Sequence, residues 1–365
     1  MMDEQYMKLV MELAKKAEGY TSPNPMVGAL VVRAENIVGR GYHARAGAAH
    51  AEIMALNEAG ERAEGATLYV NLEPCCHYGR TGPCVEMIIA AKIKKVVIAM
   101  VDPNPLVAGK SIALLRQSGV IVITGVLENE ARRLNEVFIK YITTGIPFVA
   151  LKAAMSLDGK IATRLGESQW ITSGQARLFG HYLRHRYDAI LASVNTVILD
   201  NPSLTTRLPK GGGKDPIRII VDSRARTPPE AKIITQRSSS PTLIAVTKMA
   251  PAERVATLRK AGAEVFVMPE ENQRVSLKLL MGELAKKEIT SVLIEGGGEV
   301  HASALKAGIV DKVYWFIAPK IIGGKEAPGP VGGLGIGCLT EAIQLKEVRV
   351  RRLGEDIGVE GYIIH

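Results

Sequence analysis

Three residues in the first quarter of the chain have the types and spacing of ligands for a catalytic zinc ion. His50 is followed by Cys75, which comes directly after Pro74, and then by Cys84. One imidazole and two thiolates leave the fourth position of tetrahedral zinc free for water, which is typical of catalytic zinc sites. Zinc lowers the pKa of a bound water to about 7 and so makes hydroxide available at neutral pH. We therefore expect a hydrolytic site, with a purely structural zinc ion as the alternative.

Glu52 has the position expected of a proton shuttle for this site. It lies two residues after His50 in a predicted helix, so its carboxyl group can face the same cavity without binding the metal. Cys84 begins another predicted helix, where the helix dipole favours a thiolate. The pattern resembles the H-x-E and P-C-x-x-C motifs of zinc deaminases, although the two cysteines are further apart here. We interpret Cys76 as structural.

The second half of the chain carries two features suited to binding phosphate. Residues 291–299 predict a strand that is followed by three glycines and then by the start of a helix. This arrangement offers backbone N–H groups to an anion. A structural glycine turn is the alternative, because the segment lacks the G-x-G-x-x-G fingerprint. Another predicted strand ends in residues 222–226, with the sequence DSRAR. The hydroxyl and guanidinium groups of this segment favour NADPH, although exposed arginines are also common in turns.

Alternating apolar and helical segments predict that both halves of the chain are α/β. The pattern breaks at residues 143–147, so we expect one domain at 1–145 and a second at 146–365. The glycine-rich segment 323–337 is expected to form a mobile surface loop. In the first half, the predicted strands are 26–32, 66–72, 94–101 and 120–127, and the predicted helices are 51–63 and 85–93. In the second half, the predicted strands are 148–156, 190–193, 217–223, 242–247, 264–268, 291–298 and 313–319.

The composition is that of a folded two-domain chain. Its 365 residues are 47% hydrophobic, 23% charged and 5% aromatic, which excludes disordered and disulfide-scaffold classes. No apolar run approaches the ~18 residues of a membrane helix, and residues 3–18 predict an amphipathic helix rather than a signal peptide. We therefore expect a cytoplasmic protein. The net charge of +9 indicates either a nucleic-acid surface or pockets for phosphorylated small molecules.

Further motifs carry a resemblance to a known family. In the first half they are residues 24–28 (NPMVG), 41–43 (GYH) and 74–84 (PCCHYGRTGPC). In the second half they are residues 152–160 (KAAMSLDGK), 170–172 (WIT) and 196–207, which includes Pro202. On these motifs nearly the whole chain resembles the bifunctional deaminase/reductase family of riboflavin biosynthesis. It departs from the family pattern at Gly82, where a proline is usual, and at Ser193, where a glycine is usual.

The resemblance implies a cytidine-deaminase-like three-layer domain followed by a dihydrofolate-reductase-like domain. The first would replace the ring amine of a phosphoribosylamino-diaminopyrimidinone by an oxo group, with zinc as the metal. The second would use NADPH to reduce the ribose of the product to a ribityl chain. We therefore expect a zinc-dependent pyrimidine deaminase domain at 1–145 and an NADPH-dependent reductase domain at 146–365.

The same resemblance, together with the motifs, assigns candidate residues to these sites. The catalytic candidates are Glu52 and Lys152. Candidates for binding the first substrate are Asn24, His43, His77 and Arg80, with a structural or surface role as the alternative for each. NADPH-binding candidates are Ala154, Trp170, Thr196, Asp200, Ser223, Gly296, Gly297 and Gly298. Candidates for binding the second substrate are Ser168, Arg184, Leu204, Arg207 and Glu295.

Two other functions are compatible with a zinc motif. A nucleic-acid base deaminase would use the second half to bind RNA, but the low aromatic content and the absence of an RNA-binding motif argue against it. A non-enzymatic zinc-stabilised module would bind a nucleotide at the glycine turn. We expect a phosphorylated small-molecule substrate, no nucleic-acid or membrane partner, and a homo-oligomer.

Overall fold

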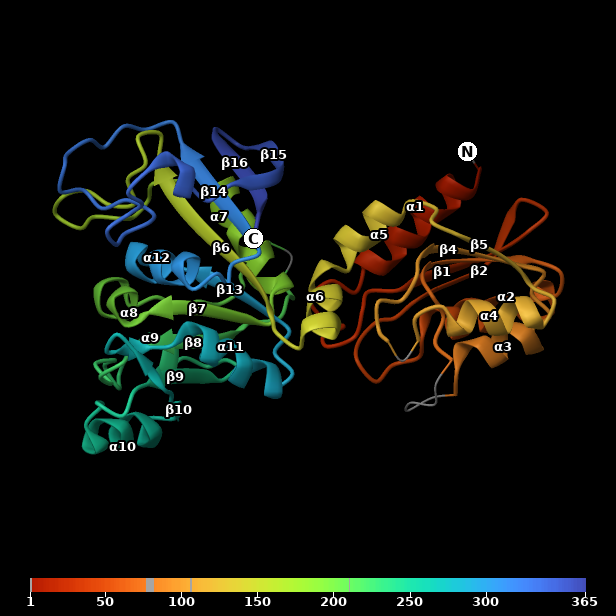
Figure 1. Cartoon of the computed structure of the whole chain (residues 1–365), viewed down its shortest axis with the longest axis horizontal. Coiled ribbons are helices and arrows are strands. Elements are labelled where there is room, and N and C mark those ends of the chain that lie inside the picture. Colours follow the sequence, from red (N-terminus) through yellow and green to blue (C-terminus); the bar gives the residue numbers. More distant parts are fainter. Residues whose placement is uncertain (1, 77–81, 106, 210) are drawn as a thin grey trace. The chain divides into compact units, whose positions relative to one another are not determined.

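The computed structural model describes residues 2–76, 82–105, 107–209 and 211–365. The chain falls into two compact units, Met1–Gly145 and Ile146–His365 (Figure 1). Each unit has its own hydrophobic core. Among the described residues, none of the helices combines the length and apolar character needed to span a bilayer.

Within the described residues, the first unit is a five-stranded mixed sheet with helices on both faces. The strands are β1 (Gly28–Arg33), β2 (Asn36–Tyr42), β3 (Thr67–Leu72), β4 (Lys95–Met100) and β5 (Ile121–Thr124). The helices are α1 (Met2–Lys15), α2 (Ala51–Ala59), η1 (Gly60–Ala63), α3 (Cys84–Ala90), α4 (Lys110–Gln117), α5 (Glu128–Leu134) and α6 (Glu136–Thr144). The strand order is β2-β1-β3-β4-β5, and β3, β4 and β5 are parallel. Helices α1 and α5 cover one face, and α2, α3 and α4 cover the other (Figure 1). The predicted three-layer fold is confirmed.

Strand β2 was not predicted, because its sequence contains few apolar residues and two glycines. The glycines allow α2 to approach the sheet closely: a Cβ atom on Gly39 would lie 2.1 Å from the carbonyl oxygen of Ala55. A side chain at this position would therefore push the helix away. The close packing places the start of α2, which carries His50 and Glu52, over the sheet.

The second unit contains, among the described residues, a nine-stranded sheet in the order β10-β9-β8-β7-β13-β6-β14-β16-β15. Its strands are β6 (Phe148–Ser156), β7 (Ala189–Ser193), β8 (Ile217–Val221), β9 (Thr242–Val246), β10 (Glu264–Val267), β13 (Ser291–Glu295), β14 (Lys312–Ala318), β15 (Leu345–Leu353) and β16 (Asp356–Ile363). Its helices are α7 (Gly174–Arg186), α8 (Val194–Asp200), α9 (Lys232–Thr235), α10 (Ala252–Lys260), α11 (Leu277–Lys286), α12 (Gly298–Lys306) and η2 (Leu339–Glu341). The strands from β10 to β14 in this order are parallel, whereas β16 is antiparallel to both β14 and β15. A hairpin of β11 (Glu270–Glu271) and β12 (Arg274–Val275) lies outside this sheet.

Alternate residues of the central strands face two different cores. Leu191 packs with residues of α11 and α12, whereas its neighbour Ile190 packs with residues of α8 and α10. Because side chains of a strand alternate between faces, a sheet covered on both sides reads as a continuous apolar run. This explains why these strands were recognisable in the sequence.

The glycine-rich segment 323–337 contains no helix or strand. Its middle part is hydrogen-bonded to α12: the Gly332 N–H donates to the Gly298 carbonyl (2.9 Å), and Nδ1 of His301 lies 2.7 Å from the Pro330 carbonyl oxygen. The Gly333 N–H also donates to the Glu299 carboxylate at 3.0 Å. These contacts hold the segment against the start of the helix that follows the three glycines.

Candidate active sites

The three predicted zinc ligands converge in the first unit. His50 lies directly before α2, Cys75 follows β3, and Cys84 is the first residue of α3. Nδ1 of His50 lies 3.1 Å from Sγ of Cys84 and 3.5 Å from Sγ of Cys75, and all three ligand atoms lie within 4.8 Å of one another. One imidazole and two thiol groups at these distances fit a single zinc ion.

The surroundings favour the thiolate form of Cys75. It accepts hydrogen bonds from the Cys84 thiol, from the ring of His50 and from the Cys84 backbone N–H at 3.3 Å. These contacts outweigh burial and lower the pKa of Cys75 to about 4, whereas the same thiol pair and burial raise the pKa of Cys84. Within this pair the thiolate is favoured at Cys75, which accepts hydrogen bonds from its neighbours, and Cys84 begins α3 as predicted.

Glu52 is the buried carboxyl group of this site. It lies in the first turn of α2, and only 4% of the residue is exposed. Burial raises the pKa of this carboxyl group. A carboxyl group with a raised pKa accepts and returns a proton more readily near neutral pH. Its environment therefore suits a proton shuttle.

A cavity of about 310 Å³ adjoins these residues. Its lining includes the predicted residues Asn24, His43, His50, Glu52 and Cys75, together with Asp102, Asn104, Phe138 and Tyr141, which were not predicted. Asp102 and Asn104 follow β4, whose carboxyl end lies beside that of the parallel strand β3. Polar residues at this edge of two parallel strands were a signal available in the sequence.

Asn24 and His43 form a hydrogen-bonded pair on the cavity wall. Nδ2 of Asn24 lies 3.1 Å from Nε2 of His43, and Nδ1 of His43 lies 3.2 Å from the Ala49 carbonyl oxygen. Because a carbonyl oxygen only accepts, Nδ1 carries the proton and Nε2 accepts from the Asn24 amide. Burial lowers the pKa of His43, which keeps the ring neutral. The other two predicted residues of this site, His77 and Arg80, lie outside the described residues.

Glu73 is a positioning residue that the sequence did not reveal. This buried carboxylate accepts backbone N–H groups from Asp102 (3.2 Å), Gly109 (2.9 Å), Ser111 (3.1 Å) and Ile112 (3.3 Å). It thereby connects the end of β3 to the segment after β4 and to the start of α4. One wall of the cavity depends on this carboxylate.

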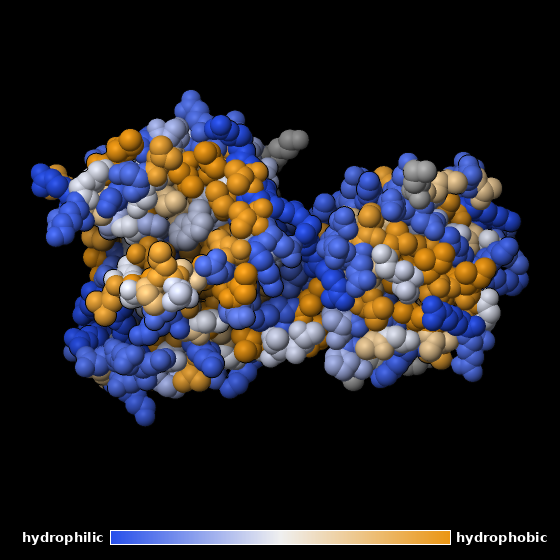
Figure 2. Space-filling model, turned by 45° about the horizontal axis from the view of Figure 1, so that its top comes forward, coloured by the Kyte–Doolittle hydropathy of each residue, from blue (hydrophilic) through white to orange (hydrophobic). Residues whose placement is uncertain are grey.

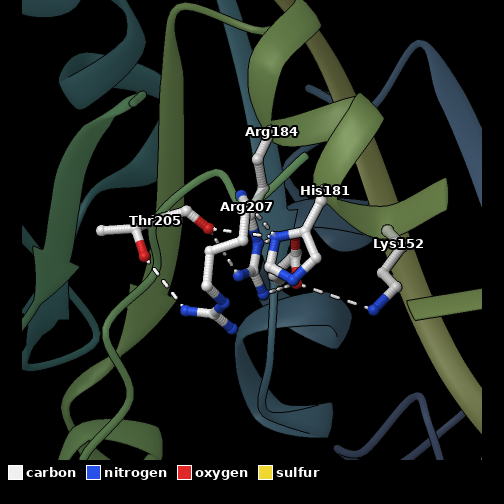
Figure 3. Close-up of polar contacts among 6 residues, drawn as sticks. Lys152, His181, Arg184, Thr205 and Arg207 are labelled. Carbon is white, nitrogen blue, oxygen red and sulfur yellow. Dashed lines mark hydrogen bonds and ion pairs between the residues drawn. The ribbon is translucent and has the colours of Figure 1, made fainter. Parts of the chain in front are cut away.

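The second unit brings three predicted residues together in a buried ion cluster, which we call the Lys-Glu-Arg cluster (Figure 3). Lys152 of β6 and Glu295 of β13 are cross-strand partners in the parallel register. Nε and Nη2 of Arg184, on α7, donate to the two carboxylate oxygens of Glu295, each at 2.9 Å. Nζ of Lys152 lies 3.6 Å from Oε2 of Glu295. The bidentate contact fixes the orientation of the carboxylate.

The charges of this cluster affect one another. Burial disfavours the charged form of Glu295, but the adjacent Arg184 and Lys152 outweigh it and lower the pKa of Glu295 to about 2. Burial lowers the pKa of Lys152, although Glu295 opposes this shift. Lys152 is therefore a better proton donor than an exposed lysine.

Arg207 lies beside the cluster on the loop that follows α8 (Figure 3). Its Nη1 donates to Oγ1 of Thr205 at 3.1 Å, while Nη1 of Arg184 donates to the Thr205 carbonyl oxygen at 3.1 Å. Arg184 is half-buried against Glu295, whereas Arg207 is exposed to solvent. Of the two arginines, Arg207 is thus the more accessible to an anion.

A second cavity of about 570 Å³ lies between the ends of β7 and β8, the β11–β12 hairpin and the start of α12. It is lined by the predicted Ser223 and by Ser193, Asn195, Arg224, Arg226, Arg274 and Glu299, among others. Arg226 donates to Oδ1 of Asn195 at 2.7 Å, and Arg274 lies 3.3 Å from the Glu299 carboxylate. Three guanidinium groups against one carboxylate suit a ligand that carries phosphate, so the residues fit NADPH.

Two of the three glycines, Gly296 and Gly297, pack against the start of α8. A Cβ atom on Gly296 would lie 2.9 Å from Oγ1 of Thr196, and one on Gly297 would lie 2.9 Å from Oγ of Ser193. Both glycines have positive φ angles, of 107° and 73°. Ser193 itself has an ordinary extended backbone, with φ −80°, and accepts the Thr196 N–H as the N-cap of α8. The departure from the usual glycine at position 193 therefore causes no strain.

Comparisons with known proteins agree with these two sites. The family model for the cytidine and deoxycytidylate deaminase zinc-binding region matches residues 1–100, and the model for the RibD C-terminal domain matches residues 147–359. The riboflavin biosynthesis protein RibD of Aquifex aeolicus is 46% identical over 97% of this chain and 97% of its own length. The corresponding protein of Escherichia coli is 42% identical over 98% of each chain. This chain belongs to the RibD family.

Solved structures of RibD proteins have the same fold. RibD of Acinetobacter baumannii matches with a TM-score of 0.88 at 36% identity, over 100% of this chain and 99% of that one. A deaminase/reductase from Thermotoga maritima matches with a TM-score of 0.87 at 36% identity and the same coverage. The predicted α/β fold, with a cytidine-deaminase-like and a dihydrofolate-reductase-like domain, is confirmed.

As a RibD protein, the chain is a bifunctional deaminase and reductase of riboflavin biosynthesis. This confirms the predicted hydrolase and oxidoreductase activities and the two cofactors, zinc and NADPH. The hypothesis of a non-enzymatic zinc module is wrong. Family membership also disfavours a deaminase of nucleic-acid bases with an RNA-binding second half.

The remaining predicted residues of the second unit lie in its loops and near the carboxyl ends of β6 and α8. Ser168 donates to Asp200 at 3.4 Å, which places a predicted substrate residue beside a predicted cofactor residue. Trp170 is exposed, and the guanidinium group of Arg177 lies 4.6 Å from its ring centroid. Half-buried Ala154, on β6, pairs with Phe316 of β14, and buried Leu204 has a left-handed backbone with φ 52°.

Proposed function

We propose that residues 1–145 deaminate 2,5-diamino-6-(5-phosphoribosylamino)pyrimidin-4(3H)-one. We propose that residues 146–365 then reduce the ribose of 5-amino-6-(5-phosphoribosylamino)uracil to the ribityl chain. The observation that carries this proposal is that one unit of the chain holds a zinc-ligand triad with a buried carboxyl group beside it. The other unit holds the Lys-Glu-Arg cluster and an arginine-lined cavity. The name of the Thermotoga maritima relative, which gives both activities, supports it.

In the first unit, His50, Cys75 and Cys84 would hold zinc. Zinc supplies a water that is acidic enough to lose a proton at neutral pH. Glu52 accepts that proton and delivers it to the ring nitrogen, and it then accepts the second proton from the new hydroxyl group and delivers it to the leaving amine. Water thus adds at the amine-bearing carbon and ammonia leaves, which converts the amine to an oxo group. Asn24 and His43 orient the pyrimidine, because their hydrogen bond fixes the direction of the Asn24 amide.

In the second unit, Ser223, the glycines at 296–298 and the residues of the 570 Å³ cavity would hold NADPH. NADPH supplies a hydride equivalent to the sugar carbon that is reduced. Lys152 donates a proton to the ribose ring oxygen as the ring opens, since burial makes it a better acid. Glu295 and Arg184 hold Lys152 in place, and Arg207 binds the substrate phosphate. Ala154, Trp170, Thr196 and Asp200 complete the NADPH site, and Ser168 and Leu204 complete the substrate site.

The variant Glu52→Gln tests the deaminase assignment directly. It keeps the size of the side chain but removes the proton-accepting group. We expect deamination to fall by about 10²–10⁴-fold while zinc stays bound, as measured by ammonia release and by metal analysis of the purified variant. Unchanged deamination would contradict the assigned role, and loss of zinc would show that Glu52 supports the metal site instead.

We also propose that the protein acts in the cytoplasm as a homo-oligomer. None of its four cysteines, all of which lie in the described residues, forms a disulfide, which is typical of reducing compartments. The edge strand β15 exposes Val348 and Val350, and hydrophobic residues reach the surface of both units (Figure 2). An edge strand leaves backbone N–H and C=O groups that can pair with a strand of another chain. Light scattering of the purified protein would show a monomer mass if the oligomer proposal is wrong.

A further inference from the structure

His181 lies in the reductase site but has no role in the assignments above. It is half-buried on α7, one helical turn before Arg184, and its ring faces the loop that carries Thr205 and Arg207 (Figure 3). Nδ1 of His181 lies 3.2 Å from the Thr205 carbonyl oxygen and 3.3 Å from the Arg207 backbone nitrogen. One ring nitrogen thus contacts the backbone on both sides of Thr206.

The chemistry of these two neighbours decides which hydrogen bond the ring makes. The Arg207 N–H can only donate, whereas the Thr205 carbonyl oxygen already accepts from Nη1 of Arg184 at 3.1 Å. Both backbone groups are satisfied if Nδ1 of His181 is unprotonated and accepts from Arg207, with the ring proton on Nε2.

The electrostatic surroundings keep the ring in this neutral form. Arg184 of α7 and Arg207 of the loop face His181, and Glu295 of β13 lies behind Arg184. Burial and the two arginine charges lower the pKa of His181 to about 4, although the Thr205 carbonyl and Glu295 oppose them. A protonated ring would lose the acceptor nitrogen and would repel both guanidinium groups.

The loop needs such support, because its backbone is constrained. Leu204 is buried in the left-handed region with φ 52°, which is uncommon for a leucine. Two side chains of α7 then hold the next peptides: Arg184 binds the Thr205 carbonyl, and His181 binds the Arg207 N–H. Helix α7 therefore fixes where the backbone of Arg207 lies and where its exposed guanidinium group can reach.

We propose that His181 is a positioning residue that holds Arg207 in place for the phosphate of the substrate. The proposal rests on the proposed function, in which Arg207 binds that phosphate. It predicts that removal of the Nδ1 acceptor weakens recognition of the phosphate without affecting NADPH binding or the ribose chemistry.

Three variants of His181 separate an acceptor at Nδ1 from a merely structural role. His181→Leu removes the acceptor, His181→Asn places an amide oxygen near the position of Nδ1, and His181→Gln places it near that of Nε2. For the leucine and glutamine variants we expect the KM for the phosphorylated uracil substrate to rise about tenfold, with kcat and the NADPH Kd little changed. The asparagine variant should keep a KM close to that of the unmodified protein. Equal KM values for asparagine and glutamine variants would overturn the proposal.

His185 offers a matched control on the same helix. Its Nδ1 also accepts a backbone N–H, that of Lys214 at 3.0 Å, at the other end of the same loop. We expect His185→Leu to leave the KM unchanged. A rise equal to that of His181→Leu would show that general tethering of the loop, and not the position of Arg207, sets the KM.

The dephosphorylated substrate distinguishes failure of this inference from failure of the proposed function. If the unmodified protein binds both substrates equally, the phosphate site itself is wrong. If it prefers the phosphorylated substrate and His181→Leu does not reduce that preference, only the inference fails. In an Arg207→Ala background, His181→Leu should cause no further rise in KM, whereas additive effects would contradict coupling between the two residues.

Discussion

At the residue scale, the Lys-Glu-Arg cluster links reductase stability to pH. The pKa of Glu295 is lowered from the usual 4.5 to about 2 in the folded protein. Such a carboxyl group stabilises the fold at pH values above the pKa that it has in the unfolded chain. This contribution is lost as the pH falls to the lower pKa that the group has in the folded protein. We therefore expect the free energy of unfolding of the second unit to fall between pH 4.5 and about 2 in part through Glu295.

Denaturant unfolding of the unmodified protein and of Glu295→Gln at several pH values checks this expectation. The glutamine variant should be less stable at pH 7, because Arg184 and Lys152 lose their charged partner. The difference between the two proteins should shrink as the pH approaches 2. A difference that stays constant over this range would show that Glu295 does not titrate in the way its contacts imply.

At the element scale, Glu73 connects two strands and a helix of the deaminase unit. Substitution by alanine would leave four backbone N–H groups of the segment 102–112 without their acceptor. Because hydrogen bonds to a charged group are among the stronger ones, we expect a loss of at least about 3 kcal/mol in unfolding free energy. In the alanine variant, the rate of amide hydrogen exchange should increase most at the start of α4. An equal increase across the whole unit would contradict this local role.

The residues proposed as zinc ligands and proton shuttle could be recognised in the sequence because they stand in short motifs. His50 and Glu52 are two residues apart, and Cys75 and Cys84 are nine residues apart. Glu73, His181 and Arg274 were missed because each acts through a partner that is distant along the chain: Gly109 is 36 residues from Glu73, and Thr205 is 24 from His181. Strand β2 was missed for a related reason, since its glycines serve the packing of α2.

At the scale of the whole molecule, two units with separate cores predict separable activities. Glu52→Gln should leave the reduction of supplied 5-amino-6-(5-phosphoribosylamino)uracil within about twofold of the unmodified rate, since independent sites behave additively. Lys152→Met should likewise leave ammonia release unchanged. NADPH oxidation and ammonia release, measured separately on each variant, check this expectation. A variant that loses both activities while remaining folded would contradict independent sites.

The central claim is that one chain carries both reactions, and mass analysis of the products tests it most directly. The purified protein, loaded with zinc, is incubated with the phosphorylated diaminopyrimidine substrate with and without NADPH. We expect exchange of one amine for an oxo group without NADPH, and the gain of two further hydrogens when NADPH is present. A substrate that stays unchanged in both reactions, or a product that never gains the two hydrogens, would contradict the account.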